Sequence, residues 1–464
     1  MGRKEKGVIS FFSAIAIGVT LSLIFALLDG ARVVSLRSLM EPRTKLLTDN
    51  VMSNYQKELY EQFGILGLDQ EYSEVDRRKE FVAKELLEEE FLYEKTIEKD
   101  GVGIDFLRYQ SMEVMDSKYQ LLTDGDGGVY LNQVARYMTS FLPKEMLDKT
   151  METFESQSTF QRKNKISDIL ADAKAALSEA SAMIETEEDE EPVELGCGEI
   201  AAYEAKKSSP ILELLLPKEE ISNKRILEQY CPSKRDLQTG TCDIEETGEL
   251  QKFLGVLYSR EKFPSFVSKS EDEYISYQLE YLVAGRMSDA ENLKIVCEKL
   301  LLLREAVQFA MMLIDPVQCE KAEAMALALV GFTGNPLIIK AVQLGILAAW
   351  SLDEAIKDVK FLLDGKKISI SEKGSDICWG YEDYLSFLLL FNSREEIAMR
   401  GLDMVEHKVN ACIEIGDFQS DQVITKIEGR IRGRISWIFG RVLLVPISSL
   451  QTITKEISFR GCYE

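Results

Sequence analysis

The first strong hydrophobic feature of the chain is an uninterrupted apolar stretch near the N-terminus. Residues 7–28, GVISFFSAIAIGVTLSLIFALL, contain no charged side chain. As a helix they would be about 33 Å long, enough to cross a hydrocarbon core of roughly 30 Å. A secretory signal has a shorter apolar core followed by small residues at a cleavage site, whereas this stretch runs into Asp29. The pattern therefore predicts a retained transmembrane helix with the lipid bilayer as its partner.

Charged residues flank this helix on both sides. They are Arg3, Lys4 and Lys6 before it and Asp29 and Arg32 after it. Because positively charged flanks stay on the cytoplasmic side, we expect residues 1–6 to be a cytoplasmic tip. The bulk of the chain is then extracytoplasmic, in a single-pass protein of the cell membrane.

A second apolar stretch, residues 322–352, is less continuous. Asn335, Pro336 and Lys340 interrupt it, and a charged residue near the middle of a membrane span is costly. We expect two buried helices joined by a turn.

A helical stripe continues beyond the membrane segment. Apolar side chains recur there at spacings of three and four, the pattern of an amphipathic helix: Leu36, Leu39, Met40, Leu47, Val51, Met52, Tyr55 and Leu59. We expect one helix from Gly7 to Phe63, bent at Pro42 and ended by Gly64. Its amphipathic part should pack on a soluble head.

Strand periodicity is clearest near the C-terminus. In residues 423–437, VITKIEGRIRGRISW, the odd positions are mostly apolar or glycine, and from Lys426 the even positions are polar or charged, which predicts a half-buried strand. QTITKEISFRG repeats the pattern, and VGIDFLRYQSMEVM shows it more weakly. We expect an antiparallel sheet from both chain ends that covers the amphipathic helix. Its basic outer face is either solvated or in contact with teichoic acid or lipid phosphates.

The remaining pattern is helical, so the predicted fold class is mainly α with a smaller antiparallel β part. The expected organisation is a long N-terminal transmembrane and amphipathic helix, a sheet from both chain ends and a large inserted helical domain. The predicted regions are the cytoplasmic tip (1–6), the transmembrane helix (7–28), its amphipathic extension (29–64), an α+β head (65–130 and 407–464), a helical arm (131–271) with an acidic loop at 185–194, and a helical domain (272–406).

The net charge of the chain bears on which classes of molecule it can bind. The 464 residues include 78 acidic and 55 basic side chains, a formal net charge of −23. An acidic surface of this kind disfavours nucleic acid as a partner. A homo-oligomer remains compatible with the sequence.

Candidate chemistry is sparse, and we predict no catalytic, cofactor-binding or metal-binding residues and no cofactor. His407 is the only histidine, and we expect it to be solvated near a helix end rather than part of a Ser/His/Asp set. TDGDGGVYLNQ begins like a calcium loop at Asp124 and Asp126, but its twelfth position is Ala135, so a turn is expected instead.

The cysteines suggest one local crosslink. There are eight, an even number that permits disulfides outside the cytoplasm. Cys231 and Cys242, separated by a loop that contains Pro, Gly and Thr, are the most plausible pair. Cys297, Cys319 and Cys412 lie in helical patterns and are expected to be buried small residues.

Several segments carry a resemblance to known families. The N-terminus, with Gly7, the apolar run and LDGAR, resembles the tight-adherence pilus proteins of the TadE and TadG type, and so pseudopilins. The chain also resembles a domain-of-unknown-function family of uncharacterised Gram-positive membrane proteins associated with tight-adherence pilus loci. GVISFFSAI, LLDGARV, YQKELYEQFGILGLD, YQLEYLVAGRMSDAENLKIVCEKLLLLREAVQF, AWSLDEAIKDVKFLLDGKKI and GYEDYLSFLLLFNSREEIAMRGLDMVE carry this second resemblance.

The resemblance implies a function in assembly and no reaction. We expect a non-enzymatic, pseudopilin-like or accessory component of a tight-adherence (type IV-like) pilus or related export system, with other pilus or envelope membrane proteins as partners. The alternatives are a membrane-tethered envelope hydrolase and an extracytoplasmic ligand-binding protein. Gly7 and Val8 are the candidate leader-processing site, although Phe12 stands where type IV pilins carry Glu in the mature helix.

Overall fold

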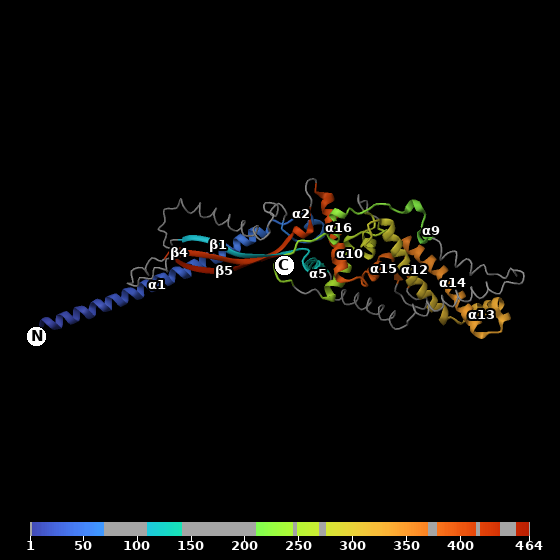
Figure 1. Ribbon diagram of the computed structural model, residues 1–464, viewed down its shortest axis with the longest axis horizontal. Coiled ribbons are helices and arrows are strands. Elements are labelled where there is room, and N and C mark those ends of the chain that lie inside the picture. Colours follow the sequence, from blue (N-terminus) through green and yellow to red (C-terminus); the bar gives the residue numbers. More distant parts are fainter. Residues whose placement is uncertain are drawn as a thin grey trace. The chain divides into compact units, whose positions relative to one another are not determined.

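The computed structural model describes residues 2–68, 109–141, 210–244, 248–268, 275–369, 378–413, 418–436 and 452–463 (Figure 1). Contacts divide the chain into two compact units. The first contains residues 1–133, 236–246 and 416–464, and the second contains residues 134–235 and 247–415. The predicted acidic loop, and most of the predicted helical arm before residue 210, lie outside the described residues.

A long N-terminal helix and a short one begin the first unit. Helix α1 spans Gly2–Met52 and passes through Pro42 without ending. Helix α2 spans Lys57–Phe63, and Gly64 ends it in the left-handed conformation, with a φ of 67°.

The prediction of one helix from Gly7 to Phe63 is therefore wrong at residues 53–56. Residues 53 and 54 form a turn bonded back to α1, and Tyr55 and Gln56 then pair with the segment that follows α2. The amide of Gln56 donates to the carbonyl of Gly67 at 2.9 Å, and Tyr55 forms an antiparallel bridge with Leu68. This pairing satisfies backbone groups that a continued helix would have satisfied internally.

Three antiparallel strands form the sheet of the first unit. Strand β4 (Ile424–Ser436) lies between β1 (Tyr109–Leu121) and β5 (Thr452–Cys462). Ile431 of β4 is opposite Val114 on one side and Ile457 on the other. The predicted strand at 423–437 and the sheet from both chain ends are confirmed. Ile104 and Phe106, which supported the weaker strand, lie outside the described residues.

The two faces of the sheet differ as the period-two pattern requires. Ile427, Ile431 and Ile435 are buried in a core that also contains Leu36 and Met40 of α1. The opposite face carries ion pairs between strands: Arg430 with Asp116, Arg432 with Glu456, and Arg434 with Glu113. The arginines of β4 thus lie beside acidic partners.

The second unit is predominantly helical. After Val134 of helix α5 (Gly128–Phe141), its α-helices are α9 (Ile211–Leu215), α10 (Glu249–Lys262), α11 (Gln278–Ala284), α12 (Asp289–Ile314), α13 (Pro316–Val330), α14 (Pro336–Leu363), α15 (Tyr381–Leu389) and α16 (Arg394–Cys412). Short 3₁₀ helices span Lys218–Glu220, Glu228–Tyr230, Pro232–Lys234 and Gly331–Thr333, and strands β2 (Ile368–Ser369) and β3 (Cys378–Trp379) pair antiparallel.

The apolar stretch at 322–352 forms part of a helical hairpin. Helices α13 and α14 are joined by residues 331–335, as the interruption at Asn335 and Pro336 predicted. The prediction that both helices are buried is wrong near this turn, where Leu327 and Leu337 are exposed by 49 and 80%. The side chain of Asn335 caps α14 by accepting from the amide of Leu337 at 3.0 Å, which satisfies one of the amides at a helix start. The inner residues of both helices, including Ala326 and Ile346, share a core with Phe309 of α12.

Candidate functional site

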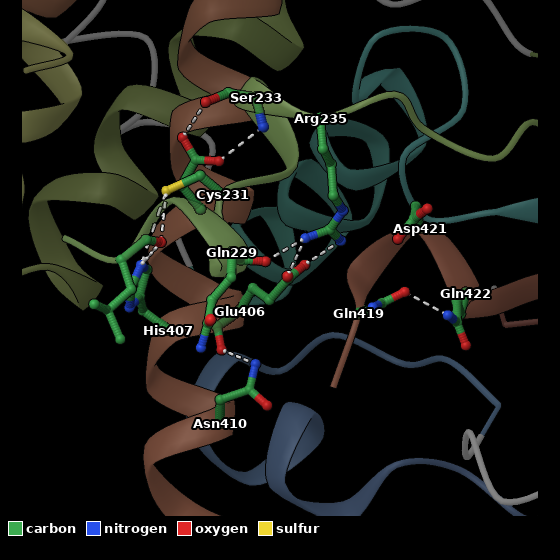
Figure 2. A network of polar contacts seen from close by, with 12 residues as sticks. Gln229, Cys231, Ser233, Arg235, Glu406, His407, Asn410, Gln419, Asp421 and Gln422 are labelled. Atoms are coloured by element: carbon green, nitrogen blue, oxygen red, sulfur yellow. Dashed lines mark hydrogen bonds and ion pairs between the residues drawn. The ribbon is translucent and has the colours of Figure 1, made fainter. Parts of the chain in front are cut away.

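The densest polar cluster in Figure 2 lies along one face of α16 in the second unit. Asp403, Glu406 and His407 are three and four residues apart, so they lie on the same face of the helix. All three are buried, with exposed fractions of 0, 0 and 3%. Most of their partners come from residues 227–235, a segment far away in the sequence, and one, Tyr281, comes from α11.

Asp403 binds this segment at Ser233, near its end, and also binds Tyr281 of α11. Its carboxylate accepts from the amide of Ser233 at 2.9 Å, from the Ser233 hydroxyl at 2.7 Å and from the Tyr281 hydroxyl at 2.7 Å. Burial raises the pKa of Asp403 to about 6, although the hydrogen bonds from Tyr281 and Ser233 act in the opposite direction. Three donors occupy its two oxygens, so the group is poorly placed to take a proton from a substrate.

Glu406 forms a two-point ion pair with Arg235. The guanidinium donates to the two carboxylate oxygens at 2.5 and 3.0 Å. The same guanidinium donates to the carbonyl of Gln229 at 3.0 Å. A paired arginine and carboxylate of this geometry is strong and directional, and here it joins α16 to both ends of the 229–235 turn.

His407 and Cys231 lie close enough to raise the question of a nucleophile and its base. The distance from Cys231 Sγ to His407 Nε2 is 3.9 Å, but both atoms also approach the carbonyl oxygen of Leu227, at 3.4 and 3.1 Å. A carbonyl oxygen only accepts, so Nε2 carries the ring proton and donates it there. In that tautomer Nε2 cannot accept the thiol proton.

Burial favours the uncharged form of both groups. It lowers the pKa of His407 to about 4, and it raises the pKa of the Cys231 thiol, with a further contribution from Asp403 and Glu406. The imidazole is therefore neutral and the thiol protonated at pH 7. A buried, protonated thiol is an inert packing group rather than a nucleophile.

The hydrogen bonds and the ion pair of this cluster therefore hold residues 227–235 against α16. The prediction that His407 is solvated is wrong, because the ring is 3% exposed and meets Tyr230 edge to face. The local pattern around residue 407 could not reveal this, since the covering residues are about 180 positions away. The sequence does carry one signal: Asp403, Glu406 and His407 are three and four residues apart, and apolar residues such as Leu402 and Val405 lie among them.

The predicted disulfide is not present. Cys231 and Cys242 are both free, buried thiols. Cys231 is directed at the carbonyl of Leu227, while Cys242 lies where its backbone amide donates to the carbonyl of Tyr119 at 3.1 Å. Cys231 thus packs beside His407 of α16, and Cys242 lies beside β1. Cys412, predicted to be buried, is exposed.

The glycine-rich segment at Asp124 is a turn, as predicted. Asp124 accepts from the amides of Leu121 and Gly240, both at 2.7 Å. Its carboxylate is therefore used to hold the turn against residue 240. Within the described parts of the chain, no group of three or more His, Cys, Asp or Glu side chains could hold a metal ion.

A second candidate site lies where α1 meets the sheet. Arg32 is fully buried, and its guanidinium donates to Asp29 at 2.8 Å and to the carbonyl of Ser436, at the end of β4, at 2.7 Å. The prediction placed Asp29 and Arg32 as charged flanks of the membrane helix. The structure brings them into one buried contact that ties the helix to the sheet.

The residues N-terminal to this contact have the opposite character. From Ser10 to Leu28 no side chain of α1 is buried, and its apolar surface includes Phe11, Phe12 and Leu27, each exposed by 65% or more. The helix is long and apolar enough to span a membrane. Arg3, Lys4, Lys6, Gly7 and Val8 lie in its first turns, and their side-chain surroundings lie outside what the structure describes.

C-terminal to Asp29 the buried face of α1 points at the sheet. It consists of Asp29, Arg32, Leu36, Met40, Thr44, Thr48 and Val51. Two glycines on the strands allow the close approach: an added Cβ would lie 2.6 Å from Met40 Sδ at Gly433 and 2.5 Å from Thr48 Cγ2 at Gly461.

Comparison with known sequences identifies a family. Residues 187–379 and 371–435 match the sequence model DUF5702, described as a family of unknown function. No curated protein and no solved structure matches the chain.

Proposed function

Because this chain belongs to DUF5702, a family of unknown function, we propose its role from its structure: a single-pass, membrane-anchored protein that acts by anchoring and protein–protein assembly. One observation carries the proposal. A single helix, α1, is apolar and uncovered over Ser10–Leu28, and its continuation has Leu36 and Met40 fully buried against the sheet.

The geometry of the junction supports an anchor that is rigidly joined to the head. Arg32 and Asp29 are buried just beyond the apolar segment, and Arg32 reaches the end of β4. A continuous helix with such a contact transmits position and orientation from the bilayer to the sheet, which a flexible tether would not do.

The same arrangement supports a pseudopilin-like role. In this proposal the N-terminus is cytoplasmic, the two units are extracytoplasmic, and the protein is an accessory component of a tight-adherence pilus or related export system. The partners are other pilus or envelope membrane proteins. The support is the resemblance of the N-terminus to proteins of the TadE and TadG type, together with an N-terminal helix that is lipid-compatible at one end and packed on a sheet at the other.

An anchoring role without catalysis fits the described polar groups better than an envelope hydrolase does. A glycoside hydrolase needs two carboxyl groups that face a substrate. The carboxylates buried along α16, Asp403 and Glu406, are engaged by Ser233, Tyr281 and Arg235 instead.

Topology is tested by fusing alkaline phosphatase after residue 70 of the membrane-inserted protein. The proposal expects high phosphatase activity, since the enzyme folds outside the cytoplasm, and a fusion that stays in the membrane after carbonate extraction. Deleting Arg3, Lys4 and Lys6 together should lower the activity by weakening the positive-inside signal. An inactive fusion with the intact N-terminus contradicts the topology.

The assembly role is tested in the source bacterium by deleting the gene and restoring it. Loss of surface pili on electron micrographs, recovered with the full chain but not with a chain that lacks residues 1–28, is the expected result. Normal piliation after deletion contradicts a role in pilus assembly and leaves only the anchor.

A further inference from the structure

The turn of the α13–α14 hairpin exposes large apolar side chains. Leu327, Phe332 and Leu337 are exposed by 49, 73 and 80%. The two helices lie side by side in Figure 1, and residues 331–335 connect them. An exposed cluster of this kind marks an interaction site more often than a solvated surface.

Charged residues are absent from the turn and from the adjoining helix ends. Residues 324–339 contain no Asp, Glu, Lys or Arg, and Glu323 and Lys340 bound the stretch. The side chain of Gln343 donates to the carbonyl of Cys319 at 2.8 Å, which fixes the level of the two helices. Residues 319 and 343 are thus opposite each other across the two antiparallel helices. Four residues closer to the turn, Glu323 is therefore opposite residue 339, the neighbour of Lys340.

The uncharged part is therefore a tip of defined depth. Seven residues, Ala324–Val330, separate Glu323 from the turn, which corresponds to about 10 Å of helix. We name residues 324–339 the hairpin tip. Behind it, the side chains of Val342 and Ile346 are buried in the core of the unit, and Glu323 and Lys340 separate the tip from the rest of the hairpin.

A lipid bilayer fits this tip better than a protein surface does. Elements that lie in the membrane interface bury their apolar face by roughly 5–10 Å, the depth that the boundary residues allow. The hydrocarbon of a bilayer carries no charge. A protein interface usually has a polar rim, and the tip has no charged side chain that could pair with one. Lys340 stands at the boundary, where its long side chain can keep the ammonium group at the level of the head groups.

We propose that the hairpin tip inserts into the interface of a neutral lipid bilayer, with Phe332 and Leu337 entering first. Glu320, Lys321, Glu323 and Lys340 flank the tip and carry no net charge, so the attraction is hydrophobic and does not select anionic lipid. This second membrane contact is independent of α1 and does not rest on a pilus role.

The test uses the full-length protein reconstituted through α1 into phosphatidylcholine vesicles. Phe332→Trp places a fluorophore at the tip, and Phe391→Trp, at a side chain 62% exposed between α15 and α16, is the matched control. Brominated phosphatidylcholine, a contact quencher, is supplied either in the same vesicles or in added protein-free vesicles. The emission of the wild-type protein, which has three tryptophans, is subtracted.

The expected result is quenching of the added emission at residue 332 that is at least threefold greater than at residue 391. Quenching in the first arrangement assigns the tip to the bilayer that holds α1, and quenching in the second assigns it to an apposed bilayer; both support the proposal. Unquenched emission in both arrangements overturns it. A blue-shifted but unquenched emission also overturns it, because the tip is then covered by protein, such as a second copy.

A charged substitution in the tip distinguishes insertion into the bilayer from a tip that only lies near the bilayer. In the Phe332→Trp protein, Leu337→Asp should reduce the quenching to the level of the Phe391→Trp control. Leu302→Asp, at a side chain 58% exposed on α12, should leave it unchanged. Quenching that survives Leu337→Asp contradicts an insertion driven by the tip.

Discussion

Met40 of α1 lies directly over Gly433 of β4, so that an added Cβ on the glycine would stand 2.6 Å from the Met40 sulfur. Leu36 is also close, at 3.5 Å from the same position. The missing side chain is what lets the helix approach the strand, and the close approach is what buries both residues of α1. The contact therefore makes the packing of α1 testable with single substitutions.

Gly433→Ala should destabilise the full chain by about 1–3 kcal/mol, the usual effect of overpacking. Met40→Ala in the same chain should recover part of this loss, because the smaller side chain makes room for the methyl group. Urea unfolding in detergent measures both. Gly30→Ala is the matched control: nothing lies within 4 Å of its added Cβ, so its stability should be unchanged or slightly higher. Equal effects at the two glycines would contradict the close packing.

Arg32→Met should have a larger effect than its counterpart Arg37→Met. Arg32 is buried with Asp29, and removing one partner of a buried pair leaves an uncompensated charge, at a cost of about 3–5 kcal/mol. Arg37 and Glu41 form an exposed pair one turn further along α1, and such pairs contribute little. Thermal unfolding in detergent distinguishes the two, and Asp29→Asn added to Arg32→Met should restore stability. Similar melting temperatures for the two single variants would contradict the role of Arg32.

His407 makes the stability of the second unit depend on pH. Its folded pKa is about 4, below its ordinary 6.5, so the unfolded chain binds the extra proton between these values. Stability from this group is therefore present above pH 6.5 and is lost as the pH falls towards 4. Relative to pH 7, the loss at pH 5 is about 2 kcal/mol. His407→Gln should remove this loss, measured as the difference in unfolding free energy between pH 5 and pH 7.

The contribution of Asp403 to stability depends on pH in the opposite direction to that of His407, so an Asp403 variant is the control for the His407 prediction. Its folded pKa is about 6, above its ordinary 3.8, so the folded state binds the extra proton and stability is lost as the pH rises through this range. In the wild type, this group raises the unfolding free energy by about 1 kcal/mol when the pH falls from 7 to 5. Asp403→Asn should lack this gain. Changes of the same sign in the two variants would contradict the environments described for these residues.

Two truncations test whether α1 does more than anchor. Deleting residues 1–28 removes the uncovered apolar helix and should leave a soluble, folded chain. Deleting residues 1–63 also removes Leu36, Met40 and Val51, whose burial contributes about 1.5–3 kcal/mol each, and should expose the sheet and cause aggregation. Size-exclusion chromatography and thermal unfolding compare the two chains. A monomeric second truncation that melts at the temperature of the first would show that the sheet does not need α1.

The elements with long, regular periodicity could be predicted from the sequence. The alternation at 423–437 specifies a strand with one buried face, and the charge-free run at 7–28 specifies an apolar helix, because each pattern repeats a local geometry over many residues. The glycines at 429 and 433 fall on the buried face of that alternation. That position was evident in the sequence; that Gly433 makes room for Met40 was not.

Only the tertiary structure decided which polar residues are buried and with what. Thr44 and Thr48 of α1 are buried although they are not among the apolar residues of the predicted stripe, and Asp29 and Arg32 are in one buried pair rather than at a solvated flank. His407 is buried because residues 227–235 cover it. The break in the helix at residues 53–56 has the same origin, since Gln56 bonds to Gly67 instead of continuing α1. A local pattern encodes the geometry of its own segment, whereas these contacts depend on partners that folding brings from distant parts of the chain.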